Sequence, residues 1–91
     1  MSEKRRGKLE IINDMLNSIK NKGGQIKPTH LLYKSNLSHS KMKVYLAELI
    51  EKDMVEEQMK KDKKVFGITD KGYEFLLEFE RIKEFSDSFG L

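Results

Sequence analysis

The side chains best suited to chemistry gather in one short stretch, "NLSHSKMKVYL", Asn36–Leu46. Its second half has apolar residues at helical spacing, so its first half should form the opening turn of a helix. The helix dipole favours acids there and disfavours cations. The stretch instead carries hydroxyl and cationic side chains and no acid: Ser38, His39, Ser40, Lys41 and Lys43.

A bound phosphate would turn that arrangement from unfavourable to favourable, because free N–H groups, hydroxyls and lysines would all converge on it. Ser, His and Lys side chains can also reach the edges of bases. We therefore expect these five residues to enter or border the major groove of double-stranded DNA. The alternative is a helix cap followed by an ordinary solvated turn.

Positive charge is unevenly distributed along the chain. The formal net charge is +3, but residues 1–69 hold 15 Lys and Arg against 9 Asp and Glu, whereas residues 70–91 hold 3 against 6. The 33 residues from Met15 to Ala47 contain six lysines and no acid. Surfaces usually mix the two signs, so this segment favours a face that meets an anion. Solubility alone is the alternative.

Further cations lie in "KKDKK", between two runs of strand character, 54–59 and 64–69. The residues 60–63 have the length of a hairpin loop, and an ordinary polar hairpin tip is one interpretation. In the other interpretation, the lysines of this hairpin contact the DNA backbone and do not read the base sequence. These lysines are Lys60, Lys61, Lys63 and Lys64. Around the short helix expected in "PTHLLYKS", phosphate contacts are expected from Lys27, Thr29 and Lys34. Arg5 and Arg6 belong to an expected flexible basic tail, residues 1–6, which is either an ordinary frayed tail or a mobile arm that contacts DNA.

Several function classes have no support in the sequence. The chain has no Cys, and no apolar run approaches the roughly 20 residues that span a bilayer. His30 and His39 are nine residues apart on different expected helices, which argues against a metal site. Phosphate-cradling glycine loops and nucleophile elbows are missing. We expect no enzyme activity, no cofactor and no small-molecule ligand, and a cytoplasmic, nucleoid-associated protein.

The elements that would position these residues follow in a recognisable order. Helices are expected at about 7–21, 28–35 and 38–52, then the hairpin, then a helix from Thr69 or Asp70 to about Phe89. The inner face of the first helix is expected to include Leu9, Ile12, Leu16 and Ile19. Two helices joined by a tight turn are the helix-turn-helix element, and the following hairpin would be a wing. The predicted fold is mainly α with a two-stranded β-hairpin, a winged helix-turn-helix over residues 7–69 with a long C-terminal helix over 70–91.

The C-terminal helix carries an apolar stripe at spacings of 4, 3 and 7: Phe75, Phe79, Ile82 and Phe89. This helix would span roughly 30 Å, more than so small a core needs. So many large apolar groups are uncommon on a monomer surface, which favours a homodimer interface. The alternative is that the helix folds back over the first helix and buries them.

Three motifs carry a resemblance to a known family: "LLYKSNLS", "YLAELIEKDMVE" and, most specifically, "FGITDKGYEFL". Over roughly residues 9–82 the chain resembles small archaeal winged-helix transcriptional regulators, which include dimeric chromatin-associated DNA-binding proteins. The resemblance implies DNA binding and dimerisation through the last helix as an antiparallel coiled coil. Asp53 stands where the family usually has Gly, and Ser86 occupies the next core position of the last helix. A winged helix used for protein–protein contact without DNA is the alternative function.

Overall fold

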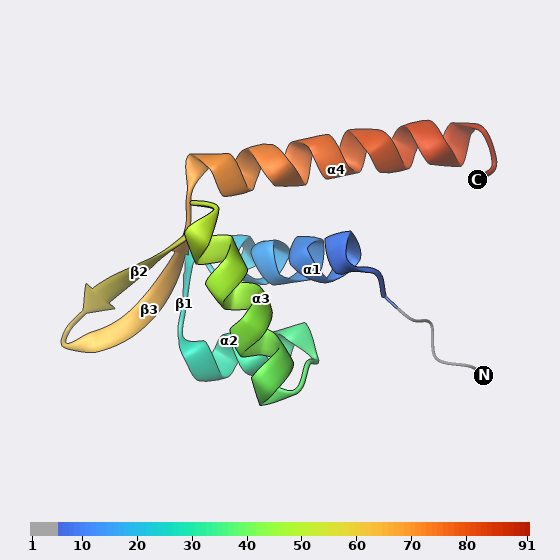
Figure 1. Ribbon diagram of the computed structural model, residues 1–91. Helices are drawn as coiled ribbons and strands as arrows, with labels where there is room; N and C mark the ends of the chain where they lie inside the picture. The colour runs from blue at the N-terminus through green and yellow to red at the C-terminus, as the bar shows by residue number, and fades with distance from the viewer. Residues whose placement is uncertain (1–5) are drawn as a thin grey trace.

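Four helices and a three-stranded antiparallel sheet make up the computed structural model, which describes residues 6–91 (Figure 1). The helices are α1 (Lys8–Asn21), α2 (Pro28–Ser35), α3 (His39–Glu51) and α4 (Asp70–Ser88). The strands are β1 (Gln25–Ile26), β2 (Val55–Lys60) and β3 (Lys63–Ile68). This order confirms the predicted winged helix-turn-helix with a long C-terminal helix, with one strand more than predicted.

The core lies where the inner faces of α1, α2 and α3 meet the base of the sheet. Met15, Leu16 and Leu31 are fully buried, and Leu49 and Val55 are nearly so. The predicted stripe of α1 is correct except at its first position. Leu9 is exposed, because the first turn of α1 lies beyond the core. Ile11 and Met15, which the spacing predicts to broaden the stripe, are buried as expected.

The turn between α2 and α3 is set by two polar residues. Asn36 adopts a left-handed conformation at the end of α2, a geometry that Asn tolerates better than most residues. Ser38 is the N-cap of α3, and its hydroxyl accepts a hydrogen bond of 3.2 Å from the Lys41 backbone N–H. Together they fix where α3 begins and therefore which side chains stand at its exposed end.

The additional strand, β1, sits at the free edge of the sheet, which has the order β1-β3-β2. Gln25 of β1 pairs with Gly67 of β3, and Glu56 of β2 pairs with the same glycine from the other side. The side-chain amide of Gln25 donates to that of Gln58 across β3. A side chain at Gly67 would collide with Gln58, so the glycine leaves room for this bond between the two outer strands.

The helix α4 starts close against the base of the wing. Thr69 caps it by accepting a hydrogen bond from the Gly72 N–H, and the Thr69 hydroxyl also donates to the Asp53 carbonyl at 2.6 Å. A Cβ at Gly72 would stand 2.5 Å from the carbonyl oxygen of Met54. The glycine of the "TDKG" motif is therefore needed for this close approach.

From that start, α4 runs alongside α1 and continues past it (Figure 1). Leu76 is buried in the core and Phe75 packs against it, whereas Ile82, Phe85 and Phe89 are exposed. The first half of α4 is thus part of the domain's core, and only its second half projects. Within residues 6–91, no helix combines the length and apolar character needed to cross a membrane.

Candidate nucleic-acid interface

The exposed end of α3 gathers the residues predicted from the sequence. Ser38, His39, Ser40, Lys41 and Lys43 are all exposed. The first turn of α3 has no acid, so its free N–H groups and the lysines give this end a positive potential. Acids return only further along the helix, at Glu48 and Glu51. Glu48 is held 2.7 Å from the Lys8 ammonium of α1, and this hydrogen bond and charge raise the pKa of Lys8.

One of the two faces of the wing lies against α3. A shallow groove is lined by His39 and Lys43 from α3 together with Glu57 and Lys64 from the wing. Lys64 lies 3.7 Å from Glu57, a cross-strand ion pair that is half-exposed on both sides. An exposed pair of this kind contributes little to stability, so Lys64 can exchange its carboxylate for a phosphate. The structure therefore brings the two predicted lysine groups together at this groove.

The tip of the wing is tighter than predicted. Only Lys61 and Asp62 form the loop, because Lys60, the last residue of β2, pairs with Lys63, the first residue of β3. Both loop residues have positive φ, 51° and 64°, the pattern of the two-residue turn that suits a twisted hairpin. The predicted loop of residues 60–63 is corrected accordingly. All four lysines of the wing remain exposed.

A second basic cluster lies on the other face of the wing. Lys60 lines a pocket with Lys22, Lys27 and His30, which come from the end of α1 and the start of α2. Partial burial first, and then the positive charges of Lys22, Lys34 and Lys27, hold the pKa of His30 below its ordinary value. Lysines at a helix N-terminus are a favourable setting for an anion. Thr29 and Lys34 are exposed on α2 nearby.

Arg6 has a structural role that neither interpretation of the basic tail predicted. Its guanidinium lies 2.7 Å from the Asp14 carboxylate and donates to the Ser35 carbonyl at 3.0 Å. It therefore links α1 to the C-terminal end of α2, where carbonyl groups have no helical partner. Arg5, the other residue of the predicted arm, lies outside the described residues.

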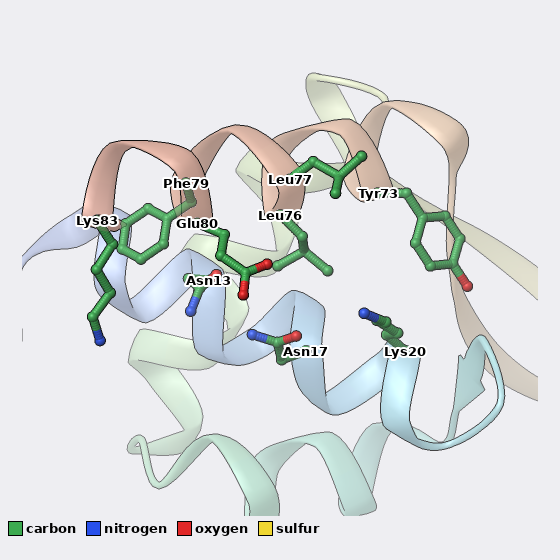
Figure 2. A pocket seen from close by; sticks show the side chains of 9 residues that line it. All are labelled: Asn13, Asn17, Lys20, Tyr73, Leu76, Leu77, Phe79, Glu80 and Lys83. Atoms are coloured by element: carbon green, nitrogen blue, oxygen red, sulfur yellow. The ribbon is translucent and has the colours of Figure 1, made fainter. Parts of the chain in front are cut away.

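A groove between α1 and α4 opens on a different side of the molecule. Asn13, Asn17 and Lys20 of α1 face Leu76 and Glu80 of α4 across it (Figure 2). Tyr73, Leu77, Phe79 and Lys83 complete the lining. The α1 side of this groove is polar, and its apolar side chains all come from α4. Within residues 6–91, no group of three or more potential metal ligands is found.

The four predicted interface residues of α4 are not equally placed. Phe75 and Phe79 are half-buried and stack with ring centroids 6.0 Å apart. Ile82 and Phe89 are exposed, and Phe85, which the predicted stripe omitted, is exposed beside Phe89 with ring centroids 5.0 Å apart. The fold-back alternative thus accounts for the first half of the stripe and leaves the second half uncovered in a single chain.

Comparison with known proteins agrees with this architecture. A family model described as winged helix-turn-helix matches residues 5–87. The chain belongs to the winged helix-turn-helix family. No curated protein sequence matches it.

Several solved structures share the winged helix-turn-helix fold at low sequence identity. Sso10a-2, a DNA-binding protein from Sulfolobus solfataricus, has a TM-score of 0.79 at 21% identity, covering 92% of this chain and 85% of that one. A winged-helix DNA-binding protein from STIV has a TM-score of 0.69 at 16% identity, covering 88% and 92%. A MarR family transcriptional regulator from Silicibacter pomeroyi has a TM-score of 0.72 at 15% identity, with 88% of this chain matching 53% of that one. These likenesses support the fold.

Within the winged helix-turn-helix, one exposed residue was missed by the sequence analysis as a candidate contact. This residue is Val44, which is 66% exposed on α3. Val44 could have been found from periodicity, because it falls out of phase with the buried Met42, Leu46 and Leu49. An apolar side chain out of phase with the core stripe of a recognition helix is a candidate for contact.

Proposed function

We propose that this winged helix-turn-helix protein binds double-stranded DNA, as a transcriptional regulator or an architectural protein of the nucleoid. The observation that carries the proposal is the meeting of α3 and the wing, where His39, Lys43 and Lys64 line one groove. The exposed end of α3 would enter the major groove of the DNA. The wing, with its exposed lysines, would follow the sugar–phosphate backbone beside it.

The arrangement of charge supports this orientation. Basic residues stand at the end of α3 that lacks acids and on the wing face beside it, and a second basic cluster lies on the other face of the wing. The acidic residues of α4 belong to the element that runs along α1 (Figure 1). Lys27 and Thr29 would contact phosphates at the start of α2, where backbone N–H groups are free, and Lys34 would contact them from its last turn. Sso10a-2 and the STIV protein, which share the fold, are described as DNA-binding proteins.

The lysine-rich composition indicates which contacts would supply affinity and which would supply sequence preference. Lysine is a point charge that suits phosphate better than bidentate contact to bases, for which arginine is the better residue. No arginine occurs among the proposed contacts on α2, α3 and the wing. Most of the affinity would therefore come from the backbone, and whatever sequence preference exists would come from the exposed face of α3.

The proposed homodimer rests on the projecting half of α4. Ile82, Phe85 and Phe89 are each about two-thirds exposed in the single chain. A second copy packed antiparallel along α4 would cover these side chains, and the resemblance to dimeric archaeal regulators points the same way. Such a pairing would place two copies of α3 on one DNA molecule, which would increase affinity through linkage of two sites.

The direct test is binding of a short random-sequence duplex, followed by fluorescence anisotropy at low salt and then at rising salt. We expect measurable binding at low salt that weakens steeply between about 50 and 200 mM, because phosphate neutralisation releases counterions. Failure to bind the duplex at low salt would contradict the proposal and favour a protein-interaction module. A single-stranded DNA of the same length serves as the control for duplex recognition.

A further inference from the structure

Val44 lies at the centre of the face that α3 turns away from the core. The residues on the opposite, inner face of α3 are buried: Met42, Leu46 and Leu49. Ser40 is one helical turn before Val44 and Ala47 is three residues after it, and all three are exposed. Residues three and four apart share one face of a helix. This face therefore presents an apolar surface, made by Val44 and Ala47, next to the polar end of the helix.

The charges around this apolar surface fix what can approach it. Lys41 and Lys43 precede Val44 in sequence and are exposed, so an anionic surface is attracted to this end of α3. Glu48, one turn further on, has its charge offset by Lys8 at 2.7 Å, and Glu51, about two turns further on, would repel phosphate. Val44 thus lies one helical turn before the first acid of α3, within the part of α3 that a duplex could occupy.

Val44 cannot contribute to phosphate binding, because its side chain has no hydrogen-bond donor and no charge. Inside the major groove, the apolar group that a base pair presents is the C5-methyl group of thymine. We infer that Val44, with Ala47 beside it, contacts thymine methyl groups and gives the protein a preference for thymine at the bases opposite the second turn of α3. This inference rests on the proposed DNA binding and adds a specificity-determining residue to it.

The methyl group can be tested alone, because uracil pairs with adenine as thymine does and lacks only that group. We compare binding to alternating dA–dT and dA–dU duplexes of equal length at the same salt. Removing one buried methyl contact should weaken binding about fourfold. We expect the wild-type protein to bind the thymine duplex about fourfold more tightly, and Val44→Ser to bind both duplexes nearly equally.

A matched control separates the methyl contact from the altered groove hydration and stiffness of the uracil duplex. Leu9→Ser also removes a large exposed apolar side chain, on the first turn of α1, and should keep the wild-type thymine preference. A wild-type protein that binds both duplexes equally would overturn the inference and leave DNA binding intact. If Val44→Ser weakened binding to both duplexes by the same factor, the inference would also be overturned, because Val44 would then contribute to affinity without distinguishing thymine from uracil. Binding of neither duplex at low salt would instead overturn the proposed function itself.

Discussion

Replacing the four wing lysines together with alanine should reduce both the affinity for DNA and its dependence on salt. All four side chains are exposed around the tip of β2 and β3, where they would lie along the backbone. They contact no base in the proposed orientation, so binding should weaken by the same factor on every sequence. The variant carries alanine at Lys60, Lys61, Lys63 and Lys64.

The size of the effect follows from counterion release. Each phosphate contact contributes about 0.9 to the slope of log affinity against log salt. Three fully available lysines would contribute about 2.7 to this slope and four about 3.6. Lys64 has a competing carboxylate 3.7 Å away on Glu57, so the expected loss lies between these two values. Between about 50 and 200 mM salt, each lost contact corresponds to a change in affinity of about 3.5-fold.

Fluorescence anisotropy across a salt series measures the slope directly. The control variant carries alanine at four lysines outside the proposed interface: Lys20, Lys52, Lys71 and Lys83. It removes the same number of charges as the wing variant, and because none of these lysines lies in the proposed interface, its salt slope should stay close to that of the wild type. Two of these, Lys20 and Lys83, line the groove between α1 and α4. If the two variants lose slope equally, the wing has no special role and the reasoning fails.

The remaining predictions concern assembly and stability. Ile82→Asp combined with Phe85→Asp should give monomers, whereas the wild type should scatter light as twice the chain mass of 10.7 kDa; a wild-type monomer would contradict the dimer. Asp53→Gly should raise the free energy of unfolding by about 0.5–1 kcal/mol in urea denaturation, because Asp53 has a left-handed φ of 62° where α3 ends, and Asp53→Ala should lower it. Because the pKa of His30 is held below its ordinary 6.5, protonation favours the unfolded chain. The stability contribution of His30 should be present above pH 6.5 and lost as the pH falls through the lowered value, and His30→Gln should flatten this dependence.

Local signals explain why most of the fold could be predicted. Pro28, Ser38 and Thr69 stand at the starts of helices, where their backbone preferences and hydroxyl groups act within a few residues of sequence. Such interactions do not depend on the rest of the chain. The bounds of α2, α3 and α4 follow from them closely.

The features that were missed depend on distant partners. Gln25 and Ile26 carry no strand signal of their own, and β1 exists because β3 offers a free edge. The position of Arg6 depends on Asp14 and on a carbonyl 29 residues away at Ser35. Leu9 follows the core periodicity yet is exposed, because periodicity does not reveal where the core ends.

The charged residues of the candidate site could be predicted from the sequence. Lysines without neighbouring acids marked α3, and four lysines around one Asp marked the wing; the structure places His39, Lys43 and Lys64 around one groove. The role of Val44 could not be found from charge, because it is an apolar residue. The pairing of Lys64 with Glu57 required the register of β2 and β3, which the sequence does not specify.

The central claim is that duplex DNA binds at the end of α3 and along the wing, and amide NMR spectra recorded during a DNA titration test it most directly. We predict that shifts on adding duplex at low salt concentrate in residues 27–30, 38–47 and 60–64, with little change in the second half of α4. Shifts confined to α4 and the groove beside α1, or no shifts at all, would contradict the claim.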